Sequence, residues 1–279
     1  MLRVTVLGSG SRGNAFLVES QDTTVLVDAG FNPRALAKRL LLAGKRPEDV
    51  QALLLTHEHT DHACGAASAC KRWNWPLHAT AGTLSNLPDA STLVGASMFV
   101  ATLNCAFKVG NLSVVATPVP HDASEAAALV ITDQSTGCRV GIATDLGHVP
   151  ESLPKYFERL DVLVVESNHD EQMLADGPYP WMLKRRIGSQ LGHLSNKQAA
   201  AFLAQCAHKG LRSVVLAHLS ETNNAPDVAV LAAVSALRKA GWKREDVCAA
   251  HQTEIRGPYA TRANAVGARA VQLHLGLGL

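Results

Sequence analysis

Short apolar runs alternate with amphipathic stretches along most of the chain, and this pattern predicts a layered α/β fold. A continuous apolar run such as residues 52–55 is typical of a buried strand, whereas apolar positions three and four residues apart predict helices. The first helix is expected after Asn32, which can cap it, with Pro33 at its first position. We expect strands at residues 3–7, 15–19, 23–27, 52–55, 76–80, 112–117, 127–132, 139–144, 161–166, 213–217 and 247–255, and helices at residues 33–43, 63–73, 196–208 and 226–240.

One continuous domain is expected, because the chain shows neither internal repeats nor a linker. The pattern weakens between residues 87 and 107, where we expect connecting loops and edge strands. Apolar residues make up 47% of the 279 positions, which is enough for a sizeable core. We therefore assign residues 1–256 to one domain and leave a C-terminal tail at residues 257–279 unassigned.

The charge balance limits the possible partners. With 26 basic and 24 acidic residues the net charge is only +2, so any contact with nucleic acid must depend on a local basic patch. The six cysteines include no CxxC pair, which favours reduced thiols. The sequence opens without a signal pattern, and no apolar run approaches the length of a membrane span. We therefore expect a cytoplasmic protein without membrane contact, and the oligomeric state stays open.

Four potential metal ligands lie within six residues, directly after the strand expected at residues 52–55. His57 and His59 alternate and can bind one ion from the same side, whereas Asp61 and His62 come later in the turn and face elsewhere. Two half-sites of this kind indicate a two-metal centre. Imidazole and carboxylate groups suit zinc, manganese or iron, and the lack of a cysteine pair favours an open, catalytic site over a structural one.

Three further candidates follow expected strands, at the position where α/β sheets place their ligands. His121 and His218 are expected to be metal ligands, and Asp145 is placed to bridge two cations. Asp28 also ends a strand, and two interpretations remain open for it: a residue that orients a ligand histidine, or a simple turn residue before Gly30.

A glycine- and serine-rich loop joins the first two expected strands. The strand that follows it argues against a dinucleotide-binding motif, which needs a helix at that point. Either the loop is a plain hairpin connection, or Ser9, Ser11 and Asn14 lie near substrate phosphate oxygens at the rim of a site.

The ligand series, in its order and spacing, resembles the metallo-β-lactamase superfamily over residues 1–255. Within the superfamily the chain is similar to the YycJ (WalJ) group of exonuclease-like proteins. That group is similar to tRNase Z in its core but lacks an inserted nucleic-acid-binding module. The segments that carry the closer resemblance are LGSGSRGN at residues 7–14, IATDLG at 142–147, ESNHD at 166–170, YPW at 179–181 and GHLSN at 192–196.

The resemblance implies an αββα sandwich with two divalent metal ions between the sheets, zinc first and manganese as the alternative. One ion would be held by His57, His59 and His121. The other would be held by Asp61, His62 and His218, with Asp145 as the bridge. These assignments come from the resemblance, motif by motif.

The same resemblance implies that metal-bound hydroxide attacks phosphorus. Asp61 would also orient this nucleophile, and His193 would help to protonate the leaving oxygen, unless it only caps or packs a helix. His169 is a further candidate on the substrate side. Lys184, Arg185 and Arg186 can contact phosphates as a local basic patch, although three adjacent cations on a helix are ordinarily a solvated face.

The expected function is a dinuclear phosphodiesterase, namely an exonuclease acting on DNA. The alternative is a metallohydrolase of a small ester, thioester, lactone or cyclic phosphodiester at the same centre. A metal-stabilised binding protein without turnover is the third hypothesis, and failure to cleave either DNA or a model phosphodiester would favour it.

Overall fold

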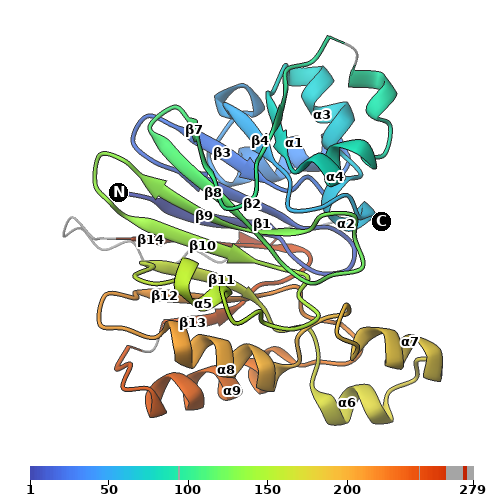
Figure 1. The fold of residues 1–279 in the computed structure, drawn as a ribbon, viewed down its shortest axis with the longest axis vertical. Coiled ribbons are helices and arrows are strands. Elements are labelled where there is room, and N and C mark those ends of the chain that lie inside the picture. Colours follow the sequence, from blue (N-terminus) through green and yellow to red (C-terminus); the bar gives the residue numbers. More distant parts are fainter. Residues whose placement is uncertain (94, 245, 262–272, 275–279) are drawn as a thin grey trace.

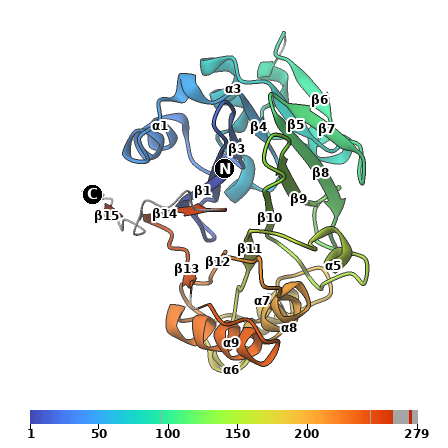
Figure 2. The ribbon, with the colours of Figure 1, turned by 90° about the vertical axis from the view of Figure 1, so that its left-hand side faces the viewer.

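The computed structural model of the chain consists of two β-sheets stacked face to face, with helices on both outer sides (Figures 1 and 2). The structure describes residues 1–93, 95–244, 246–261 and 273–274. The first sheet has the strand order β15-β14-β1-β2-β3-β4-β5-β6. Its strands are β1 (Arg3–Gly8), β2 (Ala15–Glu19), β3 (Thr24–Val27), β4 (Ala52–Leu54), β5 (Leu77–Ala79), β6 (Met98–Val100), β14 (Glu254–Ala260) and β15 (Leu273–His274).

The second sheet has the order β13-β12-β11-β10-β9-β8-β7. Its strands are β7 (Ala106–Val109), β8 (Leu112–Pro118), β9 (Ala127–Asp133), β10 (Arg139–Ala143), β11 (Val162–Glu166), β12 (Ser213–Ala217) and β13 (Val247–Ala249). The expected hairpin of β9 and β10 is antiparallel, whereas β10 to β13 run parallel to one another.

The described helices differ widely in length. No helix in the described part of the chain is long and apolar enough to cross a bilayer. The helices are α1 (Pro33–Leu42), α2 (Thr60–Ala63), α3 (Ala66–Trp73), α4 (Ala81–Ser85), α5 (Leu153–Tyr156), α6 (Glu171–Asp176), α7 (Trp181–Ile187), α8 (Asn196–Cys206) and α9 (Pro226–Lys239), with short 3₁₀ turns at Pro47–Asp49 and Ala90–Leu93.

Three buried apolar layers hold the sandwich together. Phe16 of the first sheet and Ile142 of the second belong to the central layer between the sheets. Leu40 of α1 packs on the outer face of the first sheet, and Phe202 of α8 packs on the outer face of the second. Because both faces of each sheet are covered, central strands such as β2 are buried along their whole length. The αββα fold class is thereby confirmed.

Two expected elements are divided in the structure. The helix expected at residues 63–73 is interrupted at Gly65, where a Cβ atom would lie 1.9 Å from the carbonyl oxygen of Phe31. The strand expected at residues 247–255 is two strands in different sheets, because the chain turns at Thr253, whose N–H bonds to His251 Nδ1. β14 then pairs with β1 and runs past residue 256, the expected end of the domain. Residues 262–272 and 275–279 of the expected tail lie outside the described residues.

Candidate metal centre

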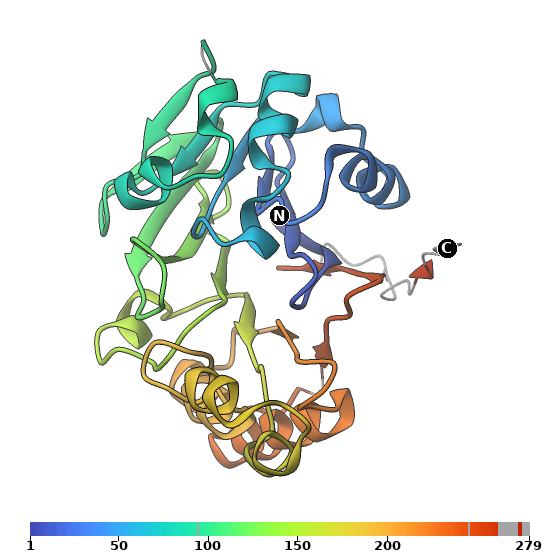
Figure 3. The same ribbon diagram turned by 90° about the vertical axis from the view of Figure 1, so that its right-hand side faces the viewer.

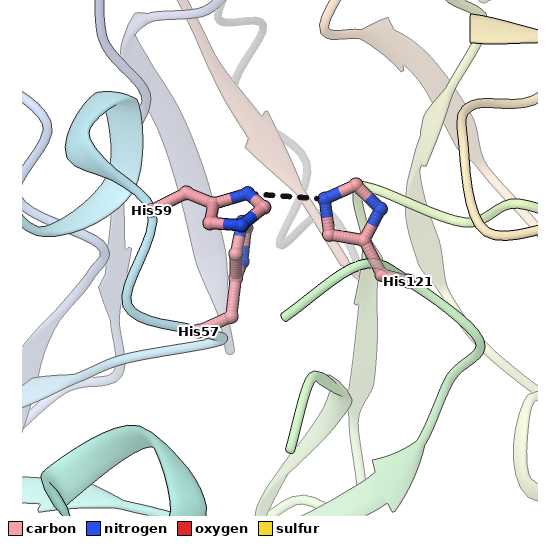
Figure 4. Close-up of side chains that lie close together, drawn as sticks. All are labelled: His57, His59 and His121. Carbon is pink, nitrogen blue, oxygen red and sulfur yellow. Dashed lines mark hydrogen bonds between the residues drawn. The ribbon is translucent and has the colours of Figure 1, made fainter. Parts of the chain in front are cut away.

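The histidines His57, His59 and His121 form one group of donor atoms (Figure 4). One nitrogen from each ring lies within 4.8 Å of the other two, and His121 Nε2 lies 3.2 Å from His59 Nδ1. Burial, with the charge of neighbouring His62, holds the pKa of His57 well below its usual value. The His57 ring is therefore neutral, and its buried Nε2 has no hydrogen-bond partner among the described residues. A neutral imidazole with a free nitrogen is the form that binds a metal ion.

A second group of donors consists of Asp61, His62 and His218. His218 Nε2 lies 3.1 Å from Asp61 Oδ2, and His62 Nε2 lies 3.6 Å from the same oxygen. α2 presents Asp61 and His62 from the first sheet, while His218 follows β12 of the second sheet. The group therefore spans the space between the sheets.

Asp145 lies between the two groups. Its Oδ2 is 2.9 Å from His62 Nε2, and its Oδ1 is 3.8 Å from His121 Nε2. The carboxylate is buried, which opposes ionisation, but His218 and His62 hold the pKa of Asp145 well below its usual value. All seven side chains expected to bind metal thus gather around one space, with the expected bridging residue in the middle.

The donor set fits divalent cations. Imidazole nitrogens and carboxylate oxygens suit zinc and manganese. Although burial opposes it, Asp145 and Asp28 raise the pKa of His62 to about 10, which favours the protonated ring. Metal binding would displace this proton.

Contacts from neighbouring residues hold His62 in position. Asp28 Oδ2 lies 2.7 Å from His62 Nδ1, and Asp28 Oδ1 accepts the backbone N–H of Thr56 at 2.8 Å. These contacts favour the orienting role for Asp28 over the turn residue. Asp28, Asp145 and His218 all adopt left-handed backbone conformations, with φ of 59°, 58° and 53°. Such conformations cost about 1–3 kcal/mol each and persist only where the surroundings fix them.

Glu166 is the site residue that the sequence analysis missed. It ends β11 and is fully buried. Its Oε1 contacts His193 Nδ1 at 2.8 Å and His218 Nδ1 at 3.0 Å, while its Oε2 accepts the backbone N–H groups of Leu146 and Leu194. Burial opposes ionisation, but the two histidines lower the pKa of Glu166 to about 2. An acid at the end of a buried strand was the signal that singled out Asp145, and Glu166 carries the same signal.

His193 lies at the cavity beside the donor groups. Burial would lower the pKa of His193, but Glu166 raises it overall. The contact of Nδ1 with Glu166 leaves Nε2 as the ring nitrogen available to a ligand. The capping role is taken by another residue, since Ser195 caps α8 together with Gln198.

A cavity of about 220 Å³ opens above the donor groups. Of the three expected loop residues, only Ser11 lines it. Ser9 and Asn14 are buried beneath: Ser9 Oγ donates to Asn14 Oδ1 and accepts the backbone N–H of His218, both at 2.8 Å. The loop therefore supports His218 through these hydrogen bonds and is more than a plain hairpin connection. The cavity is lined by Ser11, His59, Asp61, His121, Asp122, Asp145, Leu183, Arg186, Ile187, Gly192, His193 and His218.

The other expected substrate residues do not line this cavity. His169 lines a separate cavity of about 460 Å³ beside α8. Lys184 donates from Nζ to the carbonyl oxygen of Ala175 at 2.6 Å, and the guanidinium of Arg185 lies 5.4 Å from the ring centre of Trp181. Contacts of these three residues with a substrate remain predictions.

Comparison with known proteins extends these observations. A family profile described as the beta-lactamase superfamily domain matches residues 23–219. The exodeoxyribonuclease YycJ of Bacillus anthracis is 30% identical over 264 residues, covering 92% of this chain and 97% of its own. The exodeoxyribonuclease WalJ of Streptococcus pneumoniae is 31% identical over 243 residues, covering 85% of this chain and 89% of its own.

A solved structure shows the same fold at lower identity. Zn²⁺-bound PqqB from Methylobacterium extorquens superimposes with a TM-score of 0.68 at 20% identity, covering 91% of this chain and 99% of its own. At that identity the likeness extends to the fold alone.

Proposed function

This chain belongs to the metallo-β-lactamase superfamily and, within it, to the YycJ-like (WalJ-like) family, and on that premise we propose that it is a dinuclear DNA exonuclease. It is a metal-dependent hydrolase of the phosphodiesterase kind. The proposal adds three things to that statement: two ions in one site, DNA as the substrate, and cleavage from a strand end. The names of the two relatives support the last two.

One observation carries the two-ion proposal, namely the position of Asp145 between two groups of donors. His57, His59 and His121 would hold one ion, Asp61, His62 and His218 the other, and the two oxygens of Asp145 face both groups. When bound, two divalent ions lower the pKa of a water so that hydroxide can attack phosphorus, and they stabilise the charge that develops. Zinc is proposed first, with manganese as the alternative.

The side chains of the site have distinct proposed roles. Asp61, which is partly exposed to the cavity, would orient the attacking water. His193 would give a proton from Nε2 to the leaving oxygen, because Glu166 occupies its Nδ1. A single domain is also proposed, and it extends past the expected end at residue 256 because β14 runs to Ala260. All six cysteines are free thiols, which supports a cytoplasmic location as a further proposal.

Metal analysis and DNA degradation together test this function. Purified protein is expected to hold two equivalents of metal and to degrade end-labelled DNA stepwise. Asp61→Ala should abolish degradation, and His193→Ala should slow it about 100-fold or more, the usual contribution of a general acid. His208→Ala changes a histidine that precedes β12, at the end of the strands opposite to the donor groups, and serves as the matched control. Intact DNA with rapid turnover of a small ester would instead favour the alternative substrate class.

A further inference from the structure

One face of α7 borders the cavity above the donor groups. Leu183, Arg186 and Ile187, at helical spacings of three and four residues, line that cavity. Trp181 and Arg185 contact each other and do not line it. α6 and α7 project on the same side of the molecule as α2, which carries Asp61 and His62 (Figures 1 and 3).

Arg186 is the only lysine or arginine among the described residues that line the cavity. Its Nε and Nη2 atoms lie 2.8 Å and 2.7 Å from Asp122 Oδ2. Asp122 in turn lies beside the first donor group, with its Oδ1 3.4 Å from His121 Nε2. The guanidinium therefore stands at the mouth of the cavity, held in place by a carboxylate next to the expected metal ligands.

The guanidinium is still available to a ligand. The Arg186 side chain is 66% exposed, and its contacts with Asp122 use two of the five N–H donors of a guanidinium. The planar group can present the remaining donors to a phosphate, for which its fork geometry is suited. Leu183 and Ile187 beside it form an apolar wall against which a sugar or base can pack.

We propose that Arg186 binds a phosphate of the nucleic-acid strand at the mouth of the metal site, with Asp122 holding its guanidinium in position. This inference rests on the proposed phosphodiesterase function and names the residue that takes the substrate's charge. It also selects Arg186 from the three adjacent cations that were expected to contact phosphates, because Lys184 and Arg185 do not line the cavity. Without Arg186, an incoming phosphate would meet the carboxylates of Asp61 and Asp122 at the same opening.

Binding of a nuclease-resistant strand tests the proposal directly. The probe is a fluorescent, phosphorothioate-linked single-stranded oligonucleotide, and its anisotropy is measured with the metal-loaded full chain. Arg186→Gln should raise Kd on the order of 10- to 100-fold, as expected for loss of a charged hydrogen bond. It should also reduce the slope of log K against log salt by about one. Arg186→Lys keeps the charge, and its Kd should lie between those of the wild-type protein and Arg186→Gln.

Two comparisons show whether the effect belongs to Arg186. Arg185→Gln removes the same charge one residue away, on a side chain that does not line the cavity, and should weaken binding less than Arg186→Gln. Arg244→Gln, at the end of the strands of the second sheet opposite to the donor groups, should leave both Kd and activity at the wild-type level. A larger effect of Arg185→Gln would overturn the proposal.

A double variant separates phosphate binding from simple neutralisation of Asp122. If Arg186 only cancels that charge, Asp122→Asn combined with Arg186→Gln should bind DNA as tightly as Asp122→Asn alone. We expect the double variant to remain weaker, and equal Kd values would overturn the proposal. In turnover, Arg186→Gln should raise KM for DNA more than it lowers kcat.

The outcomes also separate this inference from the function it rests on. A wild-type protein that neither binds nor cleaves DNA but hydrolyses a small ester refutes the proposed function. A wild-type protein that cleaves DNA, with Kd and KM unchanged in Arg186→Gln, refutes the inference alone. Because Arg186 is exposed, its variants should melt at the wild-type temperature, and that measurement confirms that they are folded.

Discussion

At the scale of single residues, Glu166 determines which nitrogen of two histidines is free. By accepting from Nδ1 of both His193 and His218, it fixes the proton on that side of each ring. Nε2 of His218 then faces Asp61, and Nε2 of His193 is left for a ligand. A carboxylate in this position acts on metal affinity and on catalysis through the rings it orients.

Glu166→Gln should therefore impair metal binding as well as turnover. The amide oxygen can keep the contacts with the backbone N–H groups of Leu146 and Leu194, but the amide NH₂ then faces two Nδ1 atoms and favours the opposite tautomer. We expect metal affinity and kcat each to fall about 10- to 100-fold. Chelator competition measures the affinity, and Glu151→Gln, an exposed glutamate, is the control. Unchanged affinity with normal kcat would contradict this role.

At the scale of elements, the turn between β9 and β10 depends on one buried carboxylate. Asp133 accepts hydrogen bonds from the hydroxyl groups of Ser135 and Thr136, each at 2.6 Å, and contacts the N-terminal amine of Met1 at 3.2 Å. Burial would raise the pKa of Asp133, but these hydrogen bonds lower it to about 2.

Asp133→Asn should lower the free energy of unfolding by about 1–2 kcal/mol near neutral pH, since hydrogen bonds to a charged acceptor are lost. The folded-state pKa lies below the usual 3.8, so the unfolded chain takes up the proton first as the pH falls. The stabilisation is complete above about pH 4 and disappears toward pH 2. Urea titrations of both proteins across this range measure the difference, which should shrink as the pH falls. A constant difference would show that the charge of Asp133 is not the cause.

Elements bounded by polar turns were predictable from sequence. β2 and β12 match their predicted bounds, because each is a buried apolar run between polar residues. The start of α8 was predictable because Ser195 is a local cap. His121, Asp145 and His218 were found because each lies just beyond a buried strand.

Features that depend on distant contacts were not predictable in this way. The break between β13 and β14 follows a turn whose Gln252 side chain bonds to Arg12 and Gly13, some 240 residues away along the chain. Which face of α7 meets the cavity is likewise a matter of tertiary packing, so three adjacent cations were indistinguishable in sequence. The structure separates Arg186 from its two neighbours.

At the scale of the whole molecule, β14 closes the first sheet by pairing with β1. Val4 lies opposite Tyr259. The backbone N–H of Leu2 donates to Thr261 Oγ1, and the backbone N–H of Thr261 donates to the carbonyl oxygen of Leu2, both at 2.9 Å. Tyr259 and Thr261 are buried. The sheet is therefore incomplete without residues beyond the domain end expected at residue 256.

Truncation after Arg256 should destabilise the protein more than truncation after Thr261. The shorter chain loses the buried ring of Tyr259 and exposes the edge of β1, so we expect a difference of about 3–5 kcal/mol in the free energy of unfolding. Urea denaturation of the two truncated proteins, with the full chain as reference, measures it. Equal stabilities would show that residues 257–261 add nothing to the fold.

The order of the donors along the chain has a consequence for synthesis. The first group is complete once residue 121 has been made, but the second needs His218, and the strand that pairs with β1 ends only at Ala260. A chain still being translated therefore lacks part of its metal site until nearly four-fifths of its 279 residues are joined. On the proposed function, a nascent chain that ends before His218 lacks a ligand of the second ion and is not expected to cleave nucleic acid.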